Sequence, residues 1–120
     1  MHGAFIDPVS RAVSNFSAAP SKGYKAPQYV AACVTRLPDD AGQLYLEDGG
    51  ATGWGIPKRD VLGDVSVMRV PSGPGAAPAI GPVAVGGAKL PPRVQAAAAC
   101  APGGRAWVFG GLEDVGLANK

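Results

Sequence analysis

The chain has 120 residues, a formal net charge of +2 and a charged fraction of 17%. A chain of this length fits a single domain with a modest hydrophobic core. Its lysines and arginines are scattered along the sequence, so it lacks the clustered basic residues expected of a protein that binds nucleic acid. It also lacks an apolar run of about 18 residues, so we expect no transmembrane helix and no membrane partner.

Glycine and proline are unusually frequent, with 18 and 12 residues. Proline interrupts helices and glycine weakens them, which argues against long helices. Valine and aromatic residues between the Gly/Pro segments favour short strands joined by turns. We therefore predict a mainly β protein, a small single-domain β-barrel or β-sandwich of short strands with an extended N-terminal arm.

Residues 1–28 show no sustained hydrophobic period and are rich in serine, proline and small side chains. Segments of this kind order against a partner or stay mobile. We interpret residues 1–28 as the extended arm and residues 29–120 as the β-rich domain. The isolated apolar residues Phe5, Ile6 and Phe16 are candidate docking residues, and we expect them to contribute to binding rather than to folding.

The first half of the domain contains three strand candidates. Residues 29–37 are rich in β-forming side chains and lead into the turn sequence of residues 38–42. Residues 43–47 follow as a returning strand, so this region predicts a β-hairpin. The valine-rich residues 65–70 are the strongest strand candidate of the chain.

In the second half of the predicted domain the strand candidates are less clear. Residues 79–85 lead into a Gly-rich stretch, and residues 94–101 leave two alternatives open. The alanines of that second segment favour a helix, whereas its short length and flanking prolines favour a strand. Residues 102–105 are a candidate hairpin turn, and residues 106–109 form a candidate strand.

The two cysteines, Cys33 and Cys100, are far apart in the sequence. The first residues have neither the basic region nor the long apolar region of a signal peptide. Disulfides are rare in proteins that stay in a reducing compartment. We therefore expect two reduced, buried thiols that are dispensable for stability.

The sequence offers no convincing catalytic or metal site. The single histidine, His2, lies beside the terminus, whereas acid–base and nucleophilic catalysis usually need an activated partner such as histidine. Most acidic residues fall in Gly/Pro-rich turns, where aspartate is common for backbone reasons. The cysteines lack the CxxC spacing typical of zinc sites. We expect no enzymatic activity, no cofactor and no metal.

The two tryptophans, Trp54 and Trp107, complete the candidate docking residues. Core packing or a subunit contact is the first interpretation of such side chains, and stacking on a sugar or base is the alternative.

Several short motifs rich in small residues follow one another in a set order within residues 29–116. They are Gly55-Ile56-Pro57, then Gly63-Asp64-Val65-Ser66-Val67, then Val83-Ala84-Val85-Gly86-Gly87-Ala88, then the Ala-rich residues 94–99 with Pro102-Gly103-Gly104, and last residues 105–114. In this order the chain resembles the phage capsid decoration (head cement) protein family, over about two-thirds of its length.

The resemblance implies a structural virion protein, made in the host cytoplasm and bound to the outer capsid surface. Its partners would be the major capsid protein, whose neighbouring subunits it bridges, and neighbouring copies of itself, with a trimer as one arrangement. Two alternatives stay open. One is another minor virion component, such as a head–tail connector or tail accessory protein. The other is a small carbohydrate- or ligand-binding β-module that uses Trp54 or Trp107.

Overall fold

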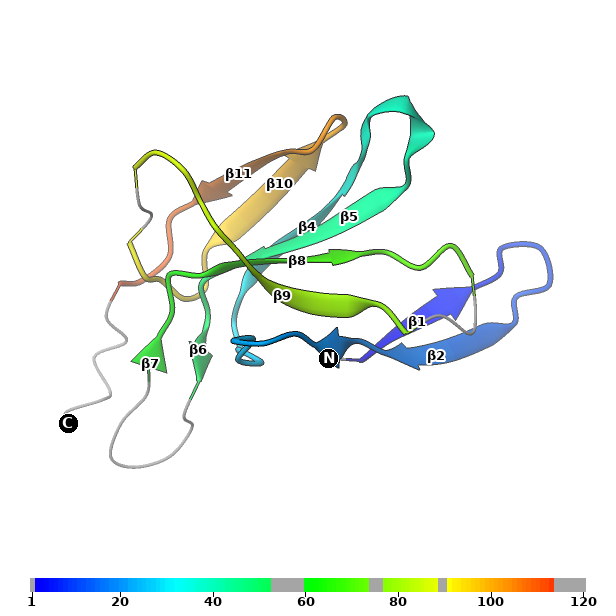
Figure 1. Cartoon of the computed structure of the whole chain (residues 1–120), viewed down its shortest axis with the longest axis horizontal. Coiled ribbons are helices and arrows are strands. Elements are labelled where there is room, and N and C mark those ends of the chain that lie inside the picture. The colour runs from blue at the N-terminus through cyan, green and yellow to red at the C-terminus, as the bar shows by residue number, and fades with distance from the viewer. Residues whose placement is uncertain (1, 53–59, 74–76, 89–90, 114–120) are drawn as a thin grey trace.

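The computed structural model describes residues 2–52, 60–73, 77–88 and 91–113 (Figure 1). These residues form strands and one short 3-10 helix, η1, so the prediction of a mainly β protein is confirmed. The described strands do not close into a barrel. In chain order the elements are β1 (His2–Ile6), β2 (Val13–Ser17), β3 (Ala19–Pro20), β4 (Ala31–Arg36), η1 (Pro38–Asp40), β5 (Gln43–Asp48), β6 (Ala51–Thr52), β7 (Asp60–Val61), β8 (Val65–Arg69), β9 (Ala79–Val83), β10 (Ala97–Ala101) and β11 (Arg105–Phe109).

A five-stranded sheet with the strand order β3-β9-β8-β5-β4 forms the centre of the molecule. Its β4–β5, β5–β8 and β8–β9 pairs are antiparallel, while β3 and β9 run parallel. The predicted hairpin of residues 29–47 is confirmed as β4 and β5, and the valine-rich strand is β8. Leu46 of β5 lies opposite Cys33 of β4 and Val67 of β8.

One face of this sheet carries the main hydrophobic cluster, in which Ala18, Met68 and Ile80 are buried. Phe16, Tyr24 and Tyr45 pack against it. The N-terminal segment is fixed at the β9 edge of the sheet by the parallel β3–β9 pair and by the Ser21 amide, which donates to the Ile80 carbonyl oxygen at 2.8 Å. Phe16, Ala18 and Tyr24 thus contribute to the folded core, and this corrects the expectation that Phe16 contributes to binding rather than to folding.

The segment before this core forms the antiparallel hairpin β1–β2, in which Ile6 pairs with Val13. Its turn is ordered by Asp7, whose Oδ1 accepts hydrogen bonds from the amides of Val9 at 2.8 Å and Ser10 at 3.1 Å. The hydrogen bond from Val9 contributes most to holding the pKa of Asp7 below its usual value, and the hydrogen bond from Ser10 adds to the effect. The N-terminal arm is therefore a β-hairpin that extends beyond the five-stranded sheet (Figure 1).

The opposite face of the sheet is covered by the hairpin β10–β11, in which Ala99 pairs with Trp107. β10 packs beside β4. In the turn after β10, the Gly103 amide donates a hydrogen bond to the Arg36 carbonyl oxygen of β4 at 2.8 Å. The structure thereby settles the two alternatives for residues 94–101: Ala97–Ala101 is a strand.

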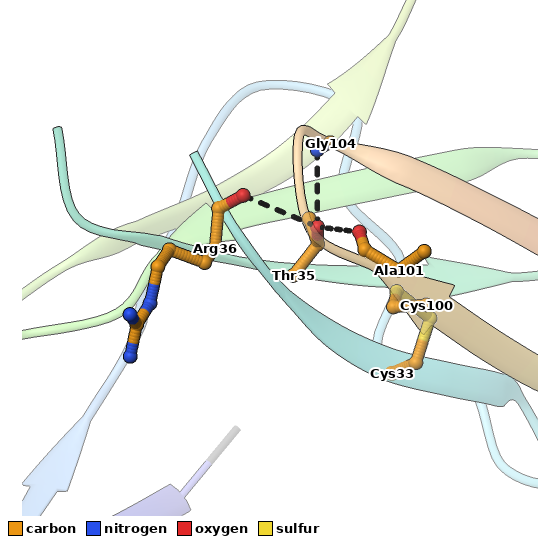
Figure 2. The surroundings of a disulfide bond; sticks show 6 residues. All are labelled: Cys33, Thr35, Arg36, Cys100, Ala101 and Gly104. Atoms are coloured by element: carbon orange, nitrogen blue, oxygen red, sulfur yellow. Dashed lines mark hydrogen bonds between the residues drawn. A yellow bond between two sulfur atoms is a disulfide. The ribbon is translucent and has the colours of Figure 1, made fainter. Parts of the chain in front are cut away.

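A disulfide joins Cys33 of β4 to Cys100 of β10, with the two Cα atoms 5.7 Å apart (Figure 2). The buried hydroxyl of Thr35 reinforces this junction by donating to the Ala101 carbonyl oxygen and accepting from the Gly104 amide at 3.1 Å. The prediction of two reduced thiols is therefore wrong. It rested on the first residues of the chain, which carry no information on which strands pack together.

Candidate functional site

The five docking residues predicted from the sequence separate into three groups. Ile6 and Trp107 are exposed, at 62% and 47% of their surface, and so are open to a partner. Phe16 is partly buried against the core cluster. Phe5 lies in β1 opposite Ser14, but its side chain is outside the described part of the structure, as is the whole of Trp54.

Exposed apolar side chains gather at the turn end of the outer face of β1–β2. Ile6 and Val13 are direct cross-strand partners and are 62% and 61% exposed, so their side chains lie next to each other on one face of the hairpin. Val9, in the turn between the two strands, is 90% exposed. We call Ile6, Val9 and Val13 the N-terminal patch. Exposed apolar groups of this kind mark candidate interaction surfaces.

A second exposed face lies on β11. Because side chains alternate along a strand, Arg105, Trp107 and Phe109 share one face of the hairpin. Their cross-strand partners in β10 are alanines. All three are exposed. We call Arg105, Trp107 and Phe109 the aromatic patch. Tryptophan and arginine are enriched among the residues that dominate binding energy at protein interfaces.

Trp107 was predicted from the sequence as a docking residue, whereas Phe109, Arg105, Val9 and Val13 were not. The signal for the aromatic patch was present in the sequence, since Arg105, Trp107 and Phe109 follow the two-residue period of a strand. Which side of that strand faces solvent depends on its packing against β4, and this was not visible in the sequence.

The two patches lie on separate hairpins with the five-stranded sheet between them (Figure 1). Phe16, in β2 of the N-terminal hairpin, packs against the cluster that contains Met68 and Ile80. The β10–β11 hairpin is linked through Cys33 to the other face. The molecule therefore presents two apolar surfaces that point away from a shared, cross-linked core.

A cavity of about 160 Å³ lies between the sheet and the inward face of β10–β11. Most of its wall is apolar, formed by Ala31, Leu46, Val65, Ala98, Ala106 and Val108. Asp48 also lines it, and burial raises the pKa of this carboxyl while nearby Arg93 opposes the shift. Arg93 Nε lies 4.0 Å from Asp48 Oδ2.

The adjacent buried carboxylate, Glu47, is fully engaged in hydrogen bonds. The hydroxyl of Tyr24 donates to Oε1 and that of Tyr45 to Oε2, both at 2.8 Å. Burial, followed by these bonds to Glu47, raises the pKa of both tyrosines well above the usual value. Glu47 is therefore held as an acceptor inside the fold, which is the arrangement of a structural group.

Within the described residues, no group of three or more histidine, cysteine, aspartate or glutamate side chains is arranged to hold a metal ion. No helix among these residues is long and apolar enough to cross a membrane. In comparisons with known proteins, the chain matches no family model, no curated protein and no solved structure.

Proposed function

We propose that the protein is a structural virion component that decorates the outside of a phage capsid and cements neighbouring major capsid subunits. The observation that carries this proposal is the pair of exposed surfaces, the N-terminal patch and the aromatic patch, on separate hairpins of one small domain. A protein with two separate docking surfaces is suited to bridging two partners. The identity of the partner as a capsid comes from the motif order described above.

The cross-linked fold is compatible with a place on the virion surface. Disulfides persist on virion surfaces but are rare in the reducing cytoplasm. If the protein is made in the host cytoplasm, the Cys33–Cys100 bond forms after assembly or on release from the cell. Under this proposal the disulfide stabilises the protein on the surface of the mature particle.

The two patches have different expected contributions to binding. Trp107 and Phe109 are the largest exposed side chains of the aromatic patch, and truncation of a dominant interface residue costs about 2 kcal/mol or more, or roughly 30-fold in affinity. The smaller side chains of Ile6 and Val13 bury less area. We expect the aromatic patch to provide most of the affinity and the N-terminal patch to provide the second, bridging contact.

The test is co-sedimentation of the full-length protein with expanded, undecorated heads of the phage that encodes it, together with the melting temperature of the decorated heads. Trp107→Ala/Phe109→Ala should lose binding. Ile6→Ser/Val13→Ser should still bind but should no longer raise the melting temperature of the heads. The matched control is Val85→Ser, since Val85 is 53% exposed outside both patches. Failure of the full-length protein to sediment with heads would contradict the proposal.

The aromatic patch also supports a second candidate, a carbohydrate-binding β-module, because Trp107 and Phe109 form an exposed surface flanked by the alanines of β10. Aromatic side chains of this kind stack on sugar rings. A glycan screen with the full-length protein and Trp107→Ala separates the two candidates. A copy count per particle separates a decoration protein, expected in hundreds of copies, from a connector or tail accessory protein, expected in about a dozen or fewer.

A further inference from the structure

Strand β11 has one edge that is not paired with any other described strand. β11 pairs only with β10, and no backbone group of residues 105–109 is bonded to another described segment. β10 lies between β11 and β4, so the second edge of β11 faces away from the sheet (Figure 1). In an antiparallel pair, every second residue directs its backbone N–H and C=O away from the partner strand. Those groups of β11 are therefore open to a further strand.

This edge also lacks the features that usually protect a strand from pairing with another chain, such as proline, several charges or a covering segment. The five-stranded sheet has them, since β3 at one edge is two residues long and contains Pro20, while β4 at the other edge packs beside β10. β11 has no proline, and its one charged residue is Arg105 at its start. Apart from chain neighbours, no described atom lies within 4 Å of where a side chain at Gly104 or Gly110 would begin, so both ends of β11 are open.

The side chains of β11 are complementary to those of a second copy of the same strand. Antiparallel pairing centred on Trp107, the middle residue of β11, would place each Arg105 opposite Phe109 of the second copy. Residues directly opposite each other share a face, so each guanidinium would lie beside an aromatic ring in a cation–π contact. The two Trp107 rings would meet at the two-fold axis. Parallel pairing would instead bring the two Arg105 side chains together, which is unfavourable.

We propose that two copies of this chain pair through the free edges of β11, antiparallel and centred on Trp107. The two β10–β11 hairpins then form one continuous sheet, in which the aromatic patches of both copies lie on the same face. The inference goes beyond the proposed function and does not rest on capsid binding. Pairing uses the backbone edge of β11, so the outward face of the joined aromatic patches stays available to another partner.

Sedimentation equilibrium of the purified full-length protein, with no heads present, tests the oligomeric state. We expect a reversible dimer with a Kd on the order of 100 µM, because an edge of five residues buries less area than a standard stable interface. A protein that stays monomeric up to about 1 mM, ten times that Kd, would overturn the proposal. A trimer would also overturn it, because pairing of one free edge with its own copy closes at two chains.

A compensating pair of substitutions tests the antiparallel register. Phe109→Lys brings a second cation opposite Arg105 of the other copy and should weaken the dimer about 10-fold. Adding Arg105→Glu to Phe109→Lys brings a carboxylate opposite an ammonium and should return the Kd to within about threefold of the wild type. Within one copy these two positions lie roughly 13 Å apart along the strand, so a rescue reports contact between copies. No rescue would overturn the proposed pairing.

Val85→Lys is the matched control, because Val85 is 53% exposed outside β11 and the substitution adds the same charge. It should leave the Kd unchanged, and a loss as large as that of Phe109→Lys would assign the effect to net charge and overturn the proposal. Should Phe109→Lys fail to fold by circular dichroism, Trp107→Lys places two cations at the two-fold axis and should likewise weaken the dimer. Since no heads are present, a monomeric result leaves the decoration proposal standing, and failure to bind heads leaves the dimer result standing.

Discussion

The hydroxyl of Tyr24 donates a 2.8 Å hydrogen bond to Glu47 Oε1, and so joins the N-terminal segment to strand β5 of the five-stranded sheet. Glu47 is only 4% exposed, so its carboxylate has little access to water and depends on protein donors. Tyr45 provides the other donor from within the same strand. The Tyr24 bond is therefore a long-range contact that stabilises the packing of residues 16–24 on the sheet.

Replacing Tyr24 by phenylalanine should lower the free energy of unfolding by about 1.5–3 kcal/mol, because the buried Glu47 carboxylate loses a hydrogen bond to a charged group. The ring itself stays in place, so packing against the core cluster is kept. Urea denaturation followed by circular dichroism measures the change. A loss below about 0.5 kcal/mol, the range of an ordinary surface substitution, would show that water replaces the tyrosine.

The companion variant is Tyr45→Phe, which removes the other donor to the same carboxylate. Because both tyrosines bind Glu47, their effects should not be additive. The double variant leaves Glu47 without the two tyrosine donors and should lose more stability than the sum of the single variants. Simple additivity would mean that the two hydroxyls act independently.

Removing the N-terminal segment should unfold the domain rather than merely weaken docking. A chain that starts at Gln28 lacks β3, Ala18 and Tyr24, and with them much of the main hydrophobic cluster. A chain that starts at Val13 loses β1 but keeps Phe16, Ala18 and Tyr24. We expect a cooperative thermal transition from the second chain and none from the first. A cooperative transition from the chain that starts at Gln28 would contradict this.

Four strands could be predicted from the sequence because local composition and tertiary packing agree there. The segments that became β4, β5, β8 and β11 are rich in valine, aromatic and other β-forming residues and end at clear turn sequences. In β1, β2 and β3 the side chains are mostly small or polar. β3 is two residues long, and its partner β9 lies far along the chain. Contacts over such distances leave no local pattern.

The candidate sites likewise divide into features that the local sequence predicts and features that depend on how distant segments pack together. Exposure of Ile6 and Trp107 agrees with their proposed docking role, whereas burial of Phe16 depends on where residues 16–24 pack. The Cys33–Cys100 pair and the cavity beside Asp48 each need β10–β11 to pack over the sheet. Neither feature could be inferred from residue spacing alone.

Replacing both cysteines by serine should lower the free energy of unfolding by about 2–5 kcal/mol, the usual cost of removing a disulfide from a small domain. The bond closes a segment with a sequence separation of 67, so its loss frees a long loop in the unfolded chain. Thermal melting and urea denaturation of Cys33→Ser/Cys100→Ser measure the loss. An unchanged melting temperature would restore the expectation of dispensable thiols.

A reducing agent provides the matched control for the cysteine variant. It should lower the melting temperature of the wild-type protein toward that of Cys33→Ser/Cys100→Ser and should leave the variant unchanged, since the variant has no cysteines. A thiol titration of the unfolded protein should find free thiols only after reduction. Free thiols before reduction would show that the bond does not form in the isolated protein.

The pH dependence of stability should reveal the buried carboxyl of Asp48. Burial raises the pKa of this group above 3.8, the ordinary value for aspartate, although Arg93 opposes the shift. The folded protein therefore binds a proton at Asp48 more tightly than the unfolded chain does. The contribution of Asp48 is most favourable at or below the unfolded pKa, and it declines as pH rises through the window between 3.8 and the raised value.

Asp48→Asn has no carboxyl to titrate at this position, so its stability relative to the wild type should increase as pH rises through that window and then level off. Asp7→Asn is the matched control of opposite sign, because hydrogen bonds from the Val9 and Ser10 amides lower the pKa of Asp7. Its stability relative to the wild type should fall as pH rises through the range below and around 3.8. Urea denaturation of the three proteins across pH 3–8 measures both differences. A pH-independent difference between Asp48→Asn and the wild type would mean that the Asp48 carboxyl has the same pKa in the folded and unfolded states.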